Sequence, residues 1–96
     1  MALHCIRVDP TVAIARGLFD WLAPGDAVLL LGATSTLAQI DHAALSVWLA
    51  QEVTLHALAD ELALLGIDFV DPRVQVTDYT GWVDLVVEHP QQLMWA

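Results

Sequence analysis

The sequence predicts a single three-layer α/β domain, in which four to five mostly parallel strands are flanked by helices. Short apolar segments of strand length alternate along the chain with segments in which apolar residues recur every three to four positions. Such alternation is typical of parallel strands joined by right-handed helical connections. The run at 27–31 is continuously apolar, which indicates a strand covered by helices on both faces. With 96 residues, the chain is expected to form one domain that spans 1–96.

The first strand is predicted at 3–8, where it is followed by a turn that contains Pro10. Thr11 is the expected cap of the helix that follows. The apolar stripe of this helix consists of residues at i, i+4 and i+8, namely Ile14, Leu18 and Leu22. Gly17 should weaken the helix only slightly, and the Pro-Gly turn at 24–25 should end it.

The second strand is predicted to begin at Asp26 and to continue through the apolar run at 27–31, and a loop of small residues follows at 32–36. Asp41 is the expected cap of the next helix. The side of this helix that faces the core carries Ala44, Leu45, Trp48 and Leu49. A third strand is predicted at 53–57, where apolar and polar residues alternate.

The C-terminal part contains the clearest helix of the chain. Its apolar stripe consists of Leu58, Leu62 and Leu65. Gly66 ends this helix, a turn at 71–73 follows, and a fourth strand is predicted at 74–78. Thr80 is the expected cap of a last helix that reaches about Glu88, after which the chain forms a Trp-bearing tail.

The charge and the motifs of the chain argue against several classes of function. Three Arg, no Lys and twelve acidic residues give a formal net charge of −9, which repels a phosphate backbone, so direct nucleic-acid binding is not expected. No apolar run approaches the roughly 18–20 residues of a membrane-spanning helix, and Arg7 and Asp9 interrupt any signal peptide. Cys5 is the only cysteine and cannot form an intramolecular disulfide, which fits a cytoplasmic protein. Without CxxC or HExxH, neither a metal nor a cofactor is expected.

The chain is more apolar than one small domain requires. Its hydrophobic share of 57% exceeds the usual content of about 45–50%, and four of its residues are Trp. One core of this size cannot bury such a surplus, which indicates an interface with other subunits. The isolated chain is therefore expected to self-associate, and a purely structural homo-oligomer is one alternative interpretation of its function.

Several short segments, spread over nearly the whole chain, carry a family resemblance. They are VQVTDYTGWVDLVVEHPQQLMW at 74–95, Leu3-His4 near the N-terminus, Asp9-Pro10 after the first strand, and Pro24-Gly25-Asp26 before the second. Together they resemble the family of small sulfur-relay subunits called TusB or DsrH, and TusB more closely. The family usually has Ser-Pro where this chain has Asp9-Pro10. The resemblance implies a fold like that of the DsrE, DsrF and DsrH proteins.

The resemblance also implies a role within a protein complex. Relatives pair with sister DsrE/DsrF-like (TusC/TusD-like) subunits of the same fold in a heterohexamer. A cysteine of a sister subunit receives persulfide sulfur and passes it on toward 2-thiolation of the wobble uridine of tRNA. This chain would be a non-catalytic accessory subunit of such a sulfurtransferase complex. The alternative within the family is a DsrH-like role in dissimilatory sulfur oxidation, but the cysteine that some DsrH-type members carry late in the first helix is replaced by apolar residues around Leu18.

Two turns at the carboxyl ends of strands are candidates for a ligand pocket. Gly32 and Ser35 belong to a turn whose amides and hydroxyls suit a phosphate, although no GxGxxG or GxxxxGK[ST] pattern is present. Asp78 and Tyr79 follow the fourth strand and offer an acceptor and a donor. A small-molecule-binding homo-oligomer or a small enzyme would use these four residues together. The simpler interpretation makes the first turn structural and the second structural or part of an interface.

The remaining candidates are a thiol and two indoles. Cys5 is the obvious candidate for a sulfur carrier, but its place in the middle of the first strand favours a buried, inert thiol. Trp82 suits the core or an interface, and Trp95 in the tail is expected to contact its own subunit or a neighbour. The histidines are interpreted as hydrogen-bonded or surface residues: His4, His42, His56 and His89.

Overall fold

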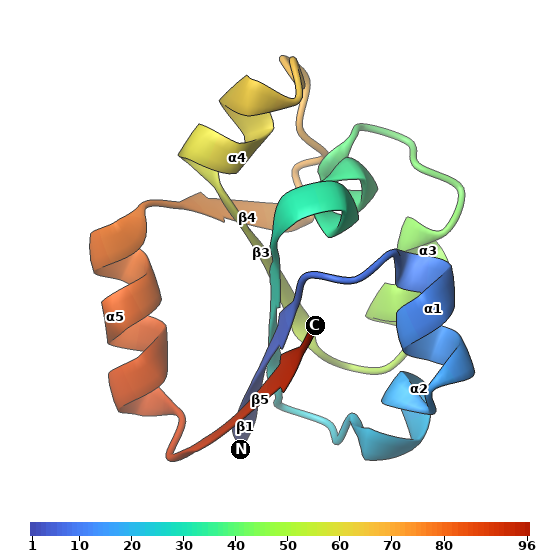
Figure 1. The fold of residues 1–96 in the computed structure, drawn as a ribbon, viewed down its shortest axis with the longest axis vertical. Helices are drawn as coiled ribbons and strands as arrows, with labels where there is room; N and C mark the ends of the chain where they lie inside the picture. The colour runs from blue at the N-terminus through green and yellow to red at the C-terminus, as the bar shows by residue number, and fades with distance from the viewer.

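A five-stranded sheet forms the centre of the molecule in the computed structural model, which describes residues 1–96. Its strands are β1 (Ala2–Ile6), β2 (Ala27–Leu30), β3 (Thr54–Leu58), β4 (Val74–Thr77) and β5 (Gln91–Trp95). They follow the order β4-β3-β2-β1-β5 across the sheet, and every neighbouring pair is parallel. The predicted fold class, a parallel sheet with helices on both faces, is confirmed (Figure 1).

The helices lie in two unequal layers. They are α1 (Pro10–Ala15), α2 (Leu18–Trp21), the 3₁₀ helix η1 (Gly32–Ala38), α3 (Leu45–Leu49), α4 (Ala59–Leu64) and α5 (Tyr79–Glu88). Figure 1 shows α5 alone on one face of the sheet, with α1, α2 and α3 on the other. Because β4 and β5 lie at opposite edges, the connection through α5 crosses the whole sheet. No helix combines the length with the apolar character that crossing a membrane takes.

Each face of the sheet has its own hydrophobic core. On one face, fourteen buried residues from the sheet, α1, α2, η1, α3 and α4 pack together, and Trp48 of α3 is the largest of them. On the other face, seven buried residues include Leu85 of α5, and the half-buried Trp82 and Val86 pack against them. A single helix therefore covers this second face, and its outer side leaves large apolar residues exposed: Tyr79, Val83 and Val87.

The first helix differs from the sequence prediction at its start and in its middle. Asp9 caps α1, because its carboxylate accepts a hydrogen bond from the backbone N–H of Thr11 at 2.9 Å, and Pro10 lies in the first turn. The prediction of Thr11 as the cap was therefore wrong. Gly17 has a φ of 89° and separates α1 from α2. This left-handed conformation ends the helix, where only a slight weakening was expected.

The segment between β2 and β3 also departs from the prediction. The expected loop at 32–36 is helical, because η1 begins at Gly32 and continues to Ala38. Asp41 does not cap α3, whose first turn follows Ala44. Its φ of 58° instead places Asp41 in a left-handed turn, a conformation that Asp tolerates better than most residues.

The C-terminal tail is the fifth strand of the sheet. It lies beside β1, with Leu3 opposite Gln92 and Ile6 opposite Trp95. The sequence predicted a tail without assigning it to the sheet, because QQLMW at 91–95 does not alternate between polar and apolar residues. Trp95 packs against the larger core of its own subunit, which is one of the two contacts expected for it.

Asp78, and not the expected Thr80, caps α5. Its carboxylate accepts a hydrogen bond from the backbone N–H of Gly81 at 2.8 Å. Asp78→Ala should therefore lower the free energy of unfolding by about 1 kcal/mol, the typical cost of a lost cap. Thr80→Ala is the matched control and should change it by less than about 0.5 kcal/mol. Chemical denaturation measures both values, and equal effects would contradict this assignment of the cap.

Candidate functional site

The predicted turn after β2 uses its hydroxyl groups within the fold. Gly32 begins η1 with a φ of 52°. Ser35 is buried, and its Oγ donates to the carbonyl of Leu30 at 3.4 Å. Thr34 Oγ1 donates to the carbonyl of Val8. Thr36 Oγ1 donates to the carbonyl of Ala33 at 2.9 Å. Because all three hydroxyl protons are engaged, the turn offers a phosphate few donors beyond its backbone amides.

The second predicted turn lies at a different place on the same edge of the sheet. Asp78 and Tyr79 follow β4, which is separated from β2 by β3. The two turns are therefore about two strand spacings apart, roughly 10 Å. Gly32, Ser35 and Asp78 line none of the four hollows of the surface, whereas Tyr79 shares one with Trp82. The four turn residues do not surround a common hollow.

An apolar surface extends over α5 and β5, and we call it the α5–β5 surface. It consists of two hollows, of about 230 and 300 Å³, whose linings share Trp82 and Val86. The other lining residues are Tyr79, Val83, Cys5, Gln92, Leu93 and Met94. None of these side chains is charged at neutral pH. Of the predicted site residues, this surface brings together only Tyr79 and Trp82, whose rings stack with their centroids 6.2 Å apart.

Cys5 lines the α5–β5 surface but exposes only 6% of its area. Burial raises the pKa of its thiol above the ordinary 9.0, and a hydrogen bond with the Trp82 side chain offsets only part of this effect. The thiol is therefore protonated near neutral pH, whereas a sulfur carrier must react as a thiolate. This environment is the one expected for a buried, inert cysteine.

A buried chain of hydrogen bonds, which the sequence pattern did not reveal, links β5 to β1 and to the start of β2. Trp95 Nε1 donates to His4 Nδ1 at 3.2 Å, and the two rings stack. An indole N–H can only donate, so Nδ1 is the accepting nitrogen of His4 and Nε2 carries the proton. Nε2 lies 3.2 Å from Asp26 Oδ2 and donates to it.

Asp26 ends this chain and also holds two backbone groups. Its carboxylate accepts hydrogen bonds from the N–H groups of Ala2 at 2.8 Å and Ala23 at 3.0 Å. Burial alone would raise the pKa of Asp26, but these two bonds and the bond from His4 outweigh it and hold the pKa below the ordinary 3.8. Both ring nitrogens of His4 and both oxygens of Asp26 are engaged. The pair is therefore a structural tie and has no free group for acid–base chemistry.

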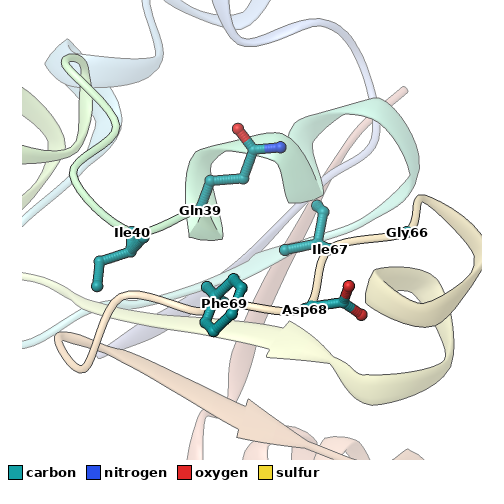
Figure 2. A pocket seen from close by; sticks show the side chains of 6 residues that line it. All are labelled: Gln39, Ile40, Gly66, Ile67, Asp68 and Phe69. Carbon is teal, nitrogen blue, oxygen red and sulfur yellow. The ribbon is translucent and has the colours of Figure 1, made fainter.

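A third hollow, of about 290 Å³, lies between the segment after η1 and the loop after α4. Figure 2 shows its lining, which consists of Gln39, Ile40, Gly66, Ile67, Asp68 and Phe69. The two segments are joined by a hydrogen bond from the N–H of Ile40 to the carbonyl of Phe69 at 3.1 Å. Its two polar side chains, Gln39 and Asp68, are exposed and converge on no common point. The exposed Phe69 ring suits a protein contact better than a small ligand.

The last hollow, of about 220 Å³, contains titratable groups under the side of α5 that faces β4. His56 is buried there, and its Nε2 lies 3.0 Å from Thr54 Oγ1. Burial lowers the pKa of His56, and the nearby His89 lowers it further, whereas Glu88 has the opposite effect. No three His, Cys, Asp or Glu side chains of the molecule are grouped so that they could hold a metal ion.

The stability of the protein should fall in acid in two steps. The pKa of His56 lies below 6.5 in the folded protein, so folding favours the neutral ring and stability decreases as the pH falls below about 6.5. The pKa values of Asp71, which accepts hydrogen bonds from Arg73, and of Asp26 lie below 3.8. Folding favours their charged forms, so more stability is lost below that pH. Melting temperatures measured over a series of pH values test these two steps. The His56→Gln variant should lose the step below about pH 6.5 and keep the step at lower pH. A wild-type melting temperature that rises as the pH falls below 6.5 would contradict the role of His56.

Comparison with known proteins identifies the relatives of this chain. Residues 13–92 match the family described as DsrH like protein. Protein TusB of Buchnera aphidicola subsp. Baizongia pistaciae is 33% identical over 94 residues, which cover 97% of this chain and 99% of that protein. Protein TusB of Erwinia tasmaniensis is 33% identical over 95 residues, with the same two shares. Protein TusB of Photorhabdus laumondii is 38% identical over 76 residues, which cover 77% of this chain and 79% of that protein. With matches that span both cores and α5, the chain belongs to the DsrH-like family, to which its short sequence segments already pointed.

Proposed function

We propose that this chain is a non-catalytic accessory subunit of a sulfurtransferase complex, which relays sulfur toward 2-thiolation of the wobble uridine of tRNA. Membership of the DsrH-like family and the similarity to TusB proteins support this role. The observation that carries its non-catalytic part is the state of Cys5, the only thiol of the chain. A sulfur carrier needs an accessible thiolate, whereas Cys5 is covered and its pKa is raised by burial.

The partners in this proposal are sister subunits of the same fold, DsrE/DsrF-like or TusC/TusD-like, that assemble with this chain into a heterohexamer in the cytoplasm. One of them supplies the reactive cysteine. Fourteen large apolar side chains of this chain are 40% or more exposed, a supply of contact surface that supports an assembly. Because its net charge of −9 repels the phosphate backbone, this chain does not bind tRNA directly in this proposal, and other subunits make that contact.

The residues favour this role over one in dissimilatory sulfur oxidation. Some DsrH-type members carry a cysteine late in the first helix, but the corresponding segment around Leu18 is apolar in this chain. Leu18 itself is buried at the start of α2, in the larger core. The thiol that would support the alternative is therefore missing, and the relatives described above bear the name TusB.

Deletion of the gene in the native host should lower thiolation of tRNA. The ratio of 2-thiolated to unmodified wobble uridine, measured by mass spectrometry of digested tRNA, should fall and be restored equally by the wild-type chain and by Cys5→Ser. A folded Cys5→Ser chain that fails to restore thiolation would place sulfur transfer on Cys5. Unchanged thiolation together with impaired oxidation of sulfur compounds would favour the alternative role.

Cys5 should also take up no transferable sulfur in vitro, because its thiol is covered and protonated. After incubation of the assembled complex with a persulfide donor, mass spectrometry should find an added sulfur atom on a sister subunit and none on this chain. Alkylation in denaturant is the control, since it should modify Cys5 as a free thiol. A stoichiometric gain of sulfur on Cys5 would disprove the non-catalytic assignment.

A further inference from the structure

Strand β5 leaves one edge of the sheet open. It pairs with β1 on one side and with no strand on the other. The carbonyl of Trp95 accepts hydrogen bonds from the N–H groups of Arg7 at 2.8 Å and Val8 at 3.2 Å, so the backbone of Trp95 points inward. Because backbone groups alternate in direction along a strand, those of Gln92 and Met94 point outward. Two N–H groups and two carbonyls are thus aligned along the edge.

This edge lacks the features that usually prevent pairing with another strand. Residues 91–95 include no charged residue and no proline. Natural edge strands are commonly protected by charges, proline or bulges. The opposite edge strand, β4, also contains neither a charged residue nor a proline, but Arg73 and Asp78 flank it directly, whereas the uncharged Pro90 and Ala96 flank β5. Of the two edges, β5 is therefore the one suited to accept another strand.

The apolar groups beside this edge would be covered by such a strand. On one face lies the α5–β5 surface, on which Val83 and Met94 are 61% and 56% exposed. On the other face, Trp95 remains half-buried against the larger core. Pairing at β5 would therefore remove apolar area from water on both faces of the sheet.

We propose that β5 pairs in antiparallel orientation with β5 of a second copy of this chain, so that two sheets join into one. The two-fold axis is perpendicular to the sheet and passes beside Leu93. Gln92 of each copy then lies opposite Met94 of the other, and their outward backbone groups exchange hydrogen bonds. We call this β5–β5 contact the joint. Because the axis is perpendicular to the sheet, the α5 faces of the two copies lie on the same side of the joined sheet, and Trp82 and Val86 of the two copies approach each other across the joint.

The charges favour a second copy in this orientation. Each chain carries a net charge of −9, so close approach of two copies needs an uncharged seam, which β5 provides. Two of the three cations lie near the C-terminal end of β5: Arg7 directly follows β1, and Arg16 donates to the carbonyl of Ala96 at 2.6 Å. Glu88 lies just before the other end. Antiparallel pairing directs the Arg pair of one copy toward Glu88 of the other, whereas parallel pairing would bring like charges together.

The joint is small enough to be reversible. A standard interface takes about 800 Å² from each partner, and the whole chain has an accessible surface of 5195 Å². A five-residue edge is about 17 Å long, and with one helix face beside it the joint falls below the standard size. We therefore expect a dimer with a Kd in the micromolar range. This inference goes beyond the proposed function, because pairing of two copies needs neither a sister subunit nor sulfur chemistry.

Sedimentation velocity over a concentration series tests the joint in the isolated full-length chain. The wild type should pass from monomer to dimer through the micromolar range, and Met94→Lys should weaken this association by about tenfold or more. Val76→Lys is the matched control: Val76 lies in the other edge strand, is 51% exposed against 56% for Met94, and gives the same change of charge. It should associate like the wild type. The melting temperatures of both variants are compared with that of the wild type at a concentration below the Kd. Values equal to the wild-type value show that both variants are folded.

Disulfide cross-linking tests the register of the pair. Leu93 of the two copies form a non-hydrogen-bonded pair, whose Cα atoms lie about 4.5 Å apart and within reach of a disulfide. In a Cys5→Ser background, Leu93→Cys should give a covalent dimer on mild oxidation. Val76→Cys in the same background should stay monomeric.

Several outcomes would overturn the proposal. A wild type that stays monomeric up to millimolar concentration excludes the joint. Dissociation by Val76→Lys but not by Met94→Lys would place it at β4, and a dimer that Leu93→Cys fails to cross-link would exclude this register. If β5 is occupied only after a sister subunit is added, the edge belongs to the heteromeric assembly. The pairing of two copies is then wrong, while the proposed function remains intact.

Discussion

A chain that ends at Pro90 should be unfolded, or close to unfolding, at room temperature. The truncation removes β5 and uncovers β1, whose five residues are all buried. It also removes Trp95, which packs on the larger core and donates the hydrogen bond to His4. Loss of a fully buried Trp side chain costs about 3–5 kcal/mol. Trp95 is only half-buried, but the truncation removes the rest of strand β5 as well. We therefore expect the free energy of unfolding to fall by at least about 3–5 kcal/mol, whereas the whole stability of a domain is about 5–15 kcal/mol.

Two single substitutions separate the contributions to this loss. Trp95→Phe keeps an aromatic ring but deprives the buried His4 Nδ1 of its donor, which should cost about 1–3 kcal/mol. Met94→Ala, in the same strand but exposed, should cost less than about 1 kcal/mol in the monomer. Urea denaturation at low protein concentration gives all three values. A truncated chain that melts like the full-length protein would show that β5 is dispensable.

Asp26→Ala should lower the free energy of unfolding by about 3–5 kcal/mol, a large effect for one polar side chain. Its carboxylate is the acceptor for three donors, the N–H groups of Ala2 and Ala23 and the Nε2–H of His4. Alanine would leave these donors without a partner, and an unsatisfied buried donor costs about 1–3 kcal/mol. Urea denaturation monitored by circular dichroism measures the loss.

Asp20→Ala is the matched control for this substitution, since Asp20 is exposed and should matter by less than about 0.5 kcal/mol. The double variant of Asp26→Ala and Trp95→Phe adds a second test. Because both residues act on the same His4 ring, their effects should deviate from additivity by about 0.5–3 kcal/mol. Equal stabilities of the Asp26→Ala and Asp20→Ala variants, or strict additivity, would refute the buried chain as a tie between β5 and the sheet.

Most elements of the fold were predictable because they follow from local periodicity. The apolar run of β2 and the leucine stripe leading into α4 depend only on neighbours within a few residues. Helix caps were less predictable, since Asp and Thr are both good capping residues. Asp9 precedes Thr11 by two positions, and Asp78 precedes Thr80 by two, so the choice rests on backbone angles that the sequence does not display.

The candidate site was predictable only in part. Tyr79 and Trp82 do meet, because they lie three residues apart on one helix. Gly32 and Asp78 were candidates for a shared pocket because both follow strands, but the strand order inserts β3 between them. Sequence position identifies the end of a strand, whereas the order of strands in the sheet decides which ends are neighbours.

The class of fold, the single domain and the family could all be read from the residues, because they rest on short-range patterns and short motifs. The role of residues 91–95 was decided by tertiary structure alone. Their partner strand, β1, lies at the other end of the sequence. The side-chain hydrogen bond between the two strands joins Trp95 to His4, which are 91 positions apart. Pairing of distant segments leaves no periodic signal in either one. That pairing places β1 in the interior of the sheet, keeps Cys5 covered, and makes the uncharged QQLMW segment the open edge.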